Sequence, residues 1–370
     1  MTAAALAVLV TPAVRAAALQ FDVVDRGGGG RVQRGRVPRL GGIALLIAGA
    51  GALAAAQVLG IGVVDLLESS GWRLRWLGAG ALVVLLLGAV DDVRGVRPVT
   101  KLAMQTLAAL IALRGGYGFG AVTNPFTGGI IALEPFGGVL TVLWIVGITN
   151  AFNLIDGLDG LAAGTGLIAS ITLFLVALAE ARPDAAVMAA TLAGVLTGFL
   201  RFNFNPASIF LGDAGSLLLG YLLSVLSIQS LQKGPTAVVI LVPVLTLGLP
   251  ILEAAATIAR RAFVAGIASV FQADRAHIHH RLLDLGMTQR RAVLVLYGVC
   301  AAFGALAFLA VSMNGIGNAA IVGGVAAAAY LGLRRLGYQL FQKSHGRPAR
   351  YGSQSKSAQF SGSASGRSRL

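Results

Sequence analysis

Charge and cysteine are the scarcest features of this chain. Only 12% of its 370 residues are charged, whereas soluble globular domains carry about 25%. The single cysteine, Cys300, excludes an intrachain disulfide framework and a cluster of thiolate ligands. Hydrophobic residues make up 56% of the chain and the mean hydropathy is +0.81. The composition therefore predicts an all-α polytopic integral membrane protein, because helices satisfy their own backbone groups in lipid.

Negative charge is scarcer than positive charge, and this bears on partners. Lys and Arg number 29 against 15 Asp and Glu, which gives a formal net charge of +14. Such an excess favours anionic lipid headgroups in the bilayer or an anionic substrate at its surface. Nucleic acid is the weaker interpretation and is not expected as a partner, because the apolar segments leave no soluble domain to hold it.

The hydropathy pattern predicts about eleven transmembrane helices. The first apolar segment lacks a basic flank before it, so it is predicted to be an uncleaved span and not a signal peptide. None of the segments suggests an interrupted helix that contains a buried charge. The eleven segments are 1–20, 41–62, 76–90, 99–113, 139–148 with its flanks, 161–179, 185–202, 217–231, 237–258, 292–312 and 316–333.

The connecting segments divide between the two sides of the membrane. Basic loops predict the cytoplasmic side, and counting spans places every polar motif on that same side. The Gly- and Pro-containing stretch 117–138 falls on the outer side, where its alternating apolar residues predict a small β-hairpin. We expect two regions: a transmembrane domain, 1–340, and a basic Ser- and Gly-rich cytoplasmic tail, 341–370, that is disordered.

The polar stretch 150–164, NAFNLIDGLDGLAAG, follows an apolar run. Asn150, Asn153, Asp156 and Asp159 recur every three residues, so on a helix they would lie on one slowly turning face. An alternative is a helix end, where Asp and Asn cap free backbone groups. Four such groups at the end of one span favour a functional site, because polar groups in membranes are costly.

Three further motifs are predicted to lie on the same side: Asp91-Asp92, Asp213 in FLGDAGS, and the histidine run 277–281. Carboxylates and amide oxygens without thiolates are ligands for Mg²⁺ or Mn²⁺ and not for Zn²⁺. Histidine and arginine bind phosphate oxygens. Together they indicate phosphoryl transfer, in which positioning and charge neutralisation do most of the catalysis.

Other interpretations remain at this point. Carboxylates in a membrane also suit an ion-coupled transporter, although such residues usually lie at mid-membrane and these lie at one surface. The histidines alone could belong to a zinc site, but no cysteine or fourth ligand lies nearby. CDP-alcohol phosphotransferases also use Asp-Gly motifs, yet the Ala-Arg pair that they need does not follow Asp156-Gly157.

Four motifs, GAVDDVRGVRPVTKLAMQ, NAFNLIDGLDGLAAG, FNFNPASIFLGDAGSLLLG and ADRAHIHHRLLDLG, carry a resemblance that covers residues 22–297. In order and spacing the chain resembles the polyprenyl-phosphate N-acetylhexosamine-1-phosphate transferases, of glycosyltransferase family 4 type. The AHIHHRL form is similar to bacterial undecaprenyl-phosphate N-acetylglucosamine-1-phosphate transferases. Phospho-N-acetylmuramoyl-pentapeptide transferases, the alternative within the superfamily, usually carry three consecutive histidines.

The resemblance implies transfer of N-acetylhexosamine 1-phosphate from a UDP-sugar to undecaprenyl phosphate, with release of UMP. It implies Mg²⁺ as the cofactor, a bacterial inner membrane location with the site facing the cytoplasm, initiation of an envelope glycan and a possible homodimer. Asp91 is the implied base, although a covalent role is equally open. The implied catalytic residues are Asp91, Asp92, Asp156, Asp159, His279 and His280; substrate would contact Lys101, Asn150, Asn203, Phe210, His277, Arg281 and Arg39; Asn153 and Asp213 would bind the metal.

The first inner loop, RVQRGRVPRLGG, departs from the family pattern. The family often has a Lys and a His ahead of the P-x-P-R-x-G-G motif, whereas this chain has Arg31 and Gln33. Arginine can still bind phosphate, and more rigidly than lysine. We therefore expect that this chain lacks whatever role the family's histidine has at this position.

Overall fold

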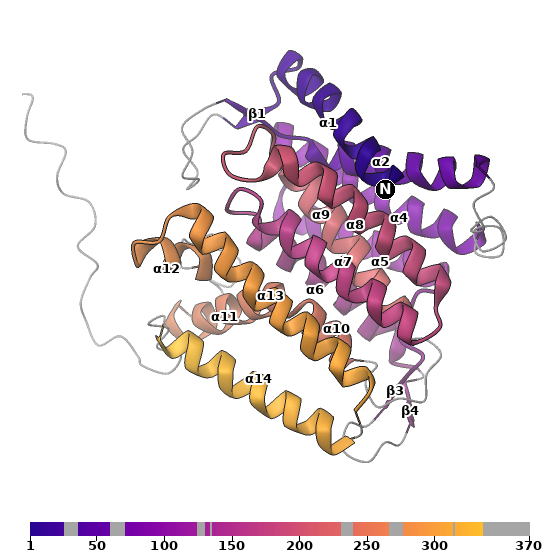
Figure 1. Ribbon diagram of the computed structural model, residues 1–370, viewed down its shortest axis with the longest axis vertical. Helices are drawn as coiled ribbons and strands as arrows, with labels where there is room; N and C mark the ends of the chain where they lie inside the picture. The colour runs from indigo at the N-terminus through magenta and orange to yellow at the C-terminus, as the bar shows by residue number, and fades with distance from the viewer. Residues whose placement is uncertain are drawn as a thin grey trace, which may run out of the picture.

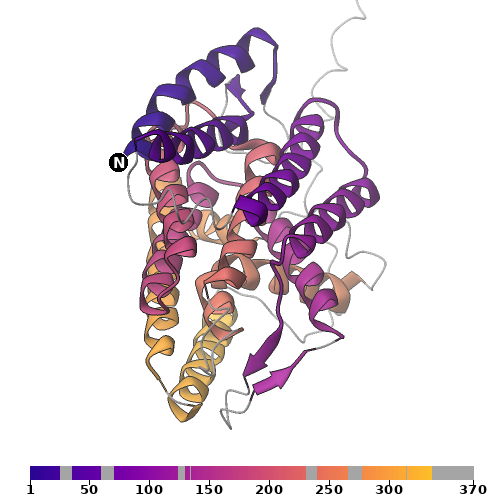
Figure 2. The same ribbon diagram turned by 90° about the vertical axis from the view of Figure 1, so that its right-hand side faces the viewer.

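The computed structural model describes residues 1–25, 36–59, 71–123, 130–133, 135–230, 240–265, 277–313 and 315–335. These residues form a mainly helical body, in which α1 and α2 lie at one edge and α14 at the opposite edge (Figures 1 and 2). The helices are α1 Thr2–Gln20, α2 Gly41–Val58, α4 Gly71–Arg94, α5 Pro98–Arg114, α6 Gly137–Ile155, α7 Leu161–Ala179, α8 Pro183–Asn203, α9 Gly212–Gln229, α10 Leu241–Thr246, α11 Gly248–Ala265, α12 Ile278–Asp284, α13 Gln289–Val311 and α14 Gly315–Arg335.

Where the structure describes them, the predicted apolar segments fall mainly on helices. Seven helices of the described part are long and apolar enough to cross a membrane, by length and composition: α1, α2, α4, α6, α7, α8 and α13. The chain is therefore a helical protein with several candidate membrane spans. The number eleven stays a prediction, and the predicted tail lies outside the described residues.

Helix α9 is the centre of the packing. Apart from Asp213 and Leu222, its residues are buried. The neighbouring helices include α4 and α6, which approach closely because glycines lie at the contacts. A Cβ atom on Gly88 of α4 would collide with Ala214, and one on Gly220 would collide with the backbone of Thr149 on α6. Small residues thus let three helices pack backbone to backbone, as in other membrane bundles.

The predicted span 237–258 was wrong in one respect, because the helix is broken. Helix α10 ends at Thr246, and α11 begins at Gly248 after Leu247. Pro250 lies in the first turn of α11 and has no N–H, so the carbonyl of Thr246 lacks its usual partner four residues on. The new helix also carries the buried Glu253, which is 2% exposed. The expectation that no span combines a break with a buried charge is therefore incorrect.

Two short antiparallel strand pairs interrupt the helical pattern. Strands β3 Ala121–Thr123 and β4 Ile130–Ala132 pair within the stretch predicted as a hairpin, with residues 124–129 outside the described part. That this pair faces the outer side stays a prediction. The second pair, β1 Val24–Asp25 with β2 Val37–Pro38, was not predicted. It brings residues on both sides of 26–35 together beside α2.

Short links between antiparallel helices gather the polar motifs at one end of the body. Residues 95–97 join α4 to α5, residues 156–160 join α6 to α7, and residues 204–211 join α8 to α9. Each link lies where an apolar helix ends and the next begins. The helix ends that carry Asp91, Asn153 and Asp213 therefore meet at the same end of the bundle.

Candidate active site

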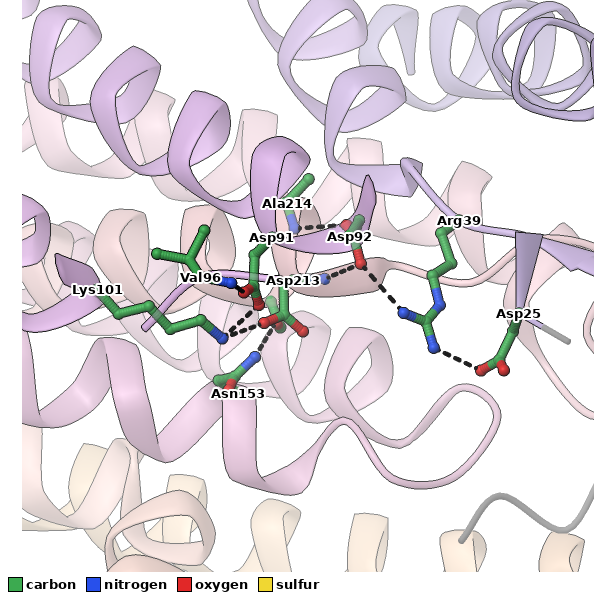
Figure 3. Close-up of polar contacts among 10 residues, drawn as sticks. Asp25, Arg39, Asp91, Asp92, Val96, Lys101, Asn153, Asp213 and Ala214 are labelled. Atoms are coloured by element: carbon green, nitrogen blue, oxygen red, sulfur yellow. Dashed lines mark hydrogen bonds and ion pairs between the residues drawn. The ribbon is translucent and has the colours of Figure 1, made fainter. Parts of the chain in front are cut away.

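Two carboxylates converge on one ammonium group at this end. Lys101 Nζ lies 2.6 Å from Asp213 Oδ2 and also pairs with Asp91 Oδ2. Figure 3 shows the three side chains pointing toward one another from different helices. Their side chains remain partly exposed, at 11% for Asp91, 22% for Lys101 and 25% for Asp213. This carboxylate–lysine cluster, made of these three residues, is thus accessible to a ligand.

Local sequence explains how α4 and α5 deliver their parts of the cluster. Gly95 has a φ of +73°, a left-handed conformation that glycine adopts at low cost, and it ends α4. Pro98 then begins α5, where a missing N–H carries no penalty. The Val96 N–H donates to Asp91 Oδ1 at 2.6 Å and holds that carboxylate across the turn. One turn into α5, Lys101 therefore faces Asp91.

Asp92 differs from its neighbour, although both were predicted as catalytic. Its Oδ1 accepts from the N–H of Asp213 at 3.0 Å, and its Oδ2 accepts from the N–H of Ala214 at 3.0 Å. The Asp92 side chain is only 1% exposed. These bonds satisfy free donors at the start of α9, where a negative charge is also favourable. Asp92 therefore caps α9 from another helix and holds Asp213 in place.

Arg39 lies next to this cap. Its guanidinium pairs with Asp25 at 2.8 Å, and one nitrogen lies 3.8 Å from Asp92 Oδ1 (Figure 3). The β1–β2 pair makes this possible, because it places Asp25 opposite Val37, two residues before Arg39. The Nε atom of Arg39 is buried and has no hydrogen-bond partner among the described residues. Arg31 and Gln33 lie outside the described residues.

The two asparagines of α6 have different surroundings. Asn153 Nδ2 donates to Ser216 Oγ at 3.0 Å, one turn along α9 from Asp213. Asn150 instead forms a reciprocal amide pair with Gln105 of α5, at 2.6 and 3.3 Å. Asn153 therefore borders the carboxylate–lysine cluster, whereas Asn150 fastens α5 to α6.

The link after α6 is held by the link before α9. Asp159 Oδ2 accepts from Asn205 Nδ2 at 3.1 Å and from the Ala207 N–H at 3.0 Å. Asn203 donates to the carbonyl of Ile209 at 2.9 Å. Phe210 is buried, and its backbone bonds to Pro38 and Gly41. Asp159, Asn203 and Phe210 thus brace loops, whereas Asp156 ends α6 and begins the link.

The histidines form a second group beside the same link. The rings of His277 and His279 are stacked with centroids 5.4 Å apart, and His280 lies 4.4 Å from His279. A Cβ atom on Gly157 would collide with Nε2 of His279, so this ring lies directly on the link. Burial, with smaller contributions from His280 and His277, lowers the pKa of His279 to about 3. His279 is therefore neutral near pH 7, and Arg281 lies on the same short helix.

Sequence reasoning missed several residues that hold these groups. Glu253 bonds to His277, Ser216 bonds to Asn153, Gln105 bonds to Asn150, and Tyr297 donates to the carbonyl of Gly160 at 2.5 Å. For Glu253 a signal was present, because it is the only acidic residue in α11 and a lone acid in an apolar helix needs a partner. The other three have no comparable signal in one sequence.

An apolar groove of about 260 Å³ lies away from the polar end, between α2, α4, α8 and α9. The residues lining it include Leu45, Leu77, Met188 and Leu222. Leu77 precedes Asp91 by fourteen residues on α4, about 21 Å along the helix. The structure therefore contains an apolar groove between predicted spans, and its use by a lipid chain stays a prediction.

Comparison with known proteins identifies the family. Residues 74–231 match the model of glycosyl transferase family 4, and this range contains the whole carboxylate–lysine cluster. The chain is 36% identical over 289 residues to a probable undecaprenyl-phosphate N-acetylglucosaminyl 1-phosphate transferase of Bacillus subtilis, covering 78% of this chain and 77% of that protein. It is 33% identical over 318 residues to a decaprenyl-phosphate N-acetylglucosaminephosphotransferase of Mycolicibacterium smegmatis, covering 80% and 77%.

A shorter similarity extends to another branch of these enzymes. The chain is 35% identical over 215 residues to a phospho-N-acetylmuramoyl-pentapeptide-transferase of Latilactobacillus sakei, which covers 55% of this chain and 65% of that protein. The similarity to the N-acetylglucosamine enzymes thus extends over more of the chain. This chain belongs to glycosyl transferase family 4, among the polyprenyl-phosphate N-acetylhexosamine-1-phosphate transferases.

Proposed function

We propose that this protein transfers N-acetylglucosamine 1-phosphate from UDP-N-acetylglucosamine to undecaprenyl phosphate. A lipid phosphate oxygen attacks the sugar-bearing phosphorus, the bond from this phosphorus to the bridging oxygen breaks, and UMP leaves. The product is a lipid pyrophosphoryl sugar, the first intermediate of a cell-envelope glycan. The relatives' names support the sugar and the acceptor.

The convergence of Asp91, Asp213 and Lys101 is the observation that carries this proposal. Phosphoryl transfer needs charge neutralisation around the reacting phosphorus and a group that accepts a proton. The cluster offers an ammonium group and two partly exposed carboxylates, each of which forms a salt bridge with that ammonium group. It lies at the polar end of an apolar bundle, where a lipid phosphate and a water-soluble nucleotide sugar can meet.

The side chains divide the work by their exposure and contacts. Asp91 takes the proton of the lipid phosphate, because it is the accessible member of the Asp91-Asp92 pair. Lys101 offsets the charge on the phosphates. Asp92 holds the start of α9, and Asp159 and Asn203 hold the surrounding loops. His277, His280 and Arg281, on the segment beside Gly157, bind the diphosphate and the sugar of the donor.

The donor set of the cluster also suits Mg²⁺. Asp91 and Asp213 direct carboxylate oxygens at one cation, Lys101, and Asn153 adds an amide beside Asp213. Within the described residues no three His, Cys, Asp or Glu side chains gather as a metal site. Mg²⁺ is commonly held by one or two carboxylates together with substrate phosphates, so this set is sufficient. When bound, the ion supplies positive charge to the diphosphate, and Mn²⁺ could replace it.

The distribution of basic residues supports a cytoplasmic site in a bacterial inner membrane. Among the described residues, the end of the bundle that contains the cluster carries many more arginines than the other end, as cytoplasmic loops do. Those on helices and links at the cluster end include Arg36, Arg39, Arg94, Arg97, Arg201, Arg281, Arg290 and Arg291. We further propose that the enzyme acts there as a homodimer and that the tail, 341–370, is a separate region outside the transferase domain.

The test is UMP release by detergent-purified protein, given undecaprenyl phosphate and each of several UDP-sugars, with Mg²⁺ or with a chelator. We expect release with UDP-N-acetylglucosamine that requires the lipid and the metal and is lost in Asp213→Asn. Asp184→Asn is the control, because it makes the same change at the far end of α8, near Arg182 and Gln229. Lack of turnover with every donor by a folded protein would reject the proposal.

The donor panel also decides between the alternatives. UDP-N-acetylmuramoyl-pentapeptide as the preferred donor would assign the enzyme to the branch represented by the Latilactobacillus sakei relative. UDP-N-acetylgalactosamine would change only the sugar. Cation flux in proteoliposomes without any UMP release would instead favour an ion-coupled transporter.

A further inference from the structure

Glu253 is a carboxylate placed deep in an apolar setting. It lies on α11 and is 2% exposed, and the described residues of this helix include no other acid. A buried carboxylate is costly unless hydrogen bonds or an opposite charge offset its lost hydration. The proposed reaction does not use Glu253 directly. Its hydrogen bonds must therefore offset the cost of burying its carboxylate.

Within the described part of the chain, the hydrogen bonds of Glu253 are all with His277 and Ile278, at the start of α12. Glu253 Oε1 lies 2.8 Å from His277 Nδ1, and both carboxylate oxygens accept from the N–H of Ile278, at 3.2 and 3.0 Å. The segment begins α12 with an N–H that has no partner within the helix. Glu253 therefore joins the broken-span helix α11 to the first turn of α12.

The hydrogen bond also determines which ring nitrogen of His277 carries a proton. Both oxygens of Glu253 already act as acceptors for the Ile278 N–H, so we assign the donor role in the contact with His277 to its Nδ1. The other ring nitrogen, Nε2, is then the atom that can meet a ligand. A hydrogen bond to one imidazole nitrogen commonly sets the behaviour of the other in this way.

A chain of contacts runs from Glu253 to the predicted active site. The His277 ring is stacked on the His279 ring with an angle of 1° between their planes. His279 in turn lies against Gly157, the residue after Asp156 at the end of α6. One turn earlier on α6, Asn153 borders the carboxylate–lysine cluster. A shift of His277 would therefore displace groups at the place where the donor is proposed to bind.

We infer that Glu253 is a positioning residue that holds α12 and orients His277, with Nδ1 protonated, so that Nε2 accepts a hydrogen bond from a sugar hydroxyl of the nucleotide-sugar donor. This inference rests on the proposed function. Glu253 itself does not touch the substrate. Its removal should weaken use of the donor and leave binding of the lipid acceptor unchanged.

The test compares Glu253→Gln with Glu180→Gln, the same change at the end of α7 that lies away from the site. Glutamine keeps the size of Glu253, but its amide can donate to His277 Nδ1 and so reverse the ring's proton arrangement. We expect kcat/KM for UDP-N-acetylglucosamine to fall about tenfold or more, by analogy with groups that orient metal-binding histidines. Glu180→Gln should match the wild type, and so should KM for undecaprenyl phosphate in both variants.

Two further measurements separate positioning from a general structural role. In a His277→Gln background, Glu253→Gln should add little further loss, because the two residues act as one unit. In histidine-labelled protein, ¹⁵N spectra should show His277 protonated at Nδ1 in the wild type and at Nε2 in Glu253→Gln. Glu253→Asp retains the charge, so it should retain the Nδ1 proton and recover part of kcat/KM; it also serves if the glutamine variant does not fold.

The outcomes distinguish this inference from the proposed function. If the wild type does not turn over, the proposed function fails and the inference fails with it. If the wild type turns over but Glu253→Gln behaves as Glu180→Gln, only the inference is overturned. Losses that simply multiply in the double variant, or an unchanged His277 spectrum, would also overturn it.

Discussion

The carboxylate–lysine cluster and the histidine group are organised by opposite means. The first consists of charged side chains that are partly exposed and satisfy one another directly. The second consists of stacked, mostly buried rings whose order depends on Glu253 and Gly157 from other segments. The carboxylate–lysine half of this candidate site is thus held by its own charges, whereas the histidine half is held by residues of neighbouring segments.

The variant that we expect to reduce activity most changes Asp91 of the carboxylate–lysine cluster. Asp91→Asn takes away the proposed proton acceptor but keeps the shape and one oxygen for the Val96 N–H. We expect kcat to fall by about 10² to 10⁴, the usual contribution of general acid–base catalysis. Thermal unfolding should remain near that of the wild type. UMP release under saturating substrates measures the change, and near-normal kcat would show that Asp91 has no chemical role.

Asp92, the residue adjacent to Asp91, should affect stability more than chemistry. Asp92→Ala removes both acceptors at the start of α9, so we expect a loss of about 2 kcal/mol in unfolding free energy, the upper end for a lost helix cap. Asp92→Asn should lose less, because it keeps one acceptor oxygen. Thermal unfolding in detergent provides the measurement. If Asp92→Ala were as stable as the wild type and inactive, Asp92 would act chemically and not as a cap.

Substitution of Gly157 should disturb the histidine group and leave the carboxylate–lysine cluster in place. In Gly157→Ala the new methyl group would collide with His279, and overpacking of this kind costs about 1 to 3 kcal/mol. We expect a raised KM for the donor with little change in KM for the lipid. Gly147→Ala is the control on α6, the helix before this link, where an added Cβ atom meets nothing within 4 Å. Equal KM values in the two variants would show that the ring does not depend on this contact.

The smallest predicted effect is a pH dependence that belongs to His279. Its pKa is about 3 in the folded protein, whereas an unfolded histidine has a pKa of about 6.5. The unfolded state therefore binds more protons as the pH falls below about 6.5, and folding stability decreases toward acid. Between pH 7 and pH 6 the loss should be below about 1 kcal/mol. Thermal unfolding of wild type and His279→Gln checks this, because the variant should lose less over that interval.

The proximity of the motifs follows largely from the sequence, for physical reasons. Long apolar segments with short links must run antiparallel, so Asp91, Asn153 and Asp213 were correctly expected at one end. The sequence did not show which of these residues has which role. Asp91 and Asp92 are chemically identical neighbours, and only the position of α9 makes one accessible and the other a buried cap.

Pattern and composition by themselves determined a helical membrane protein, the approximate position of nearly every helix and the family, because apolar length and motif spacing are local properties of the chain. The break at Leu247, the burial of Glu253 beside His277 and the β1–β2 pair that brings Asp25 to Arg39 were decided only by the tertiary structure. Each of these depends on contacts between segments far apart in sequence. A buried polar group takes its partner from whatever packing places beside it, and no local pattern specifies that partner.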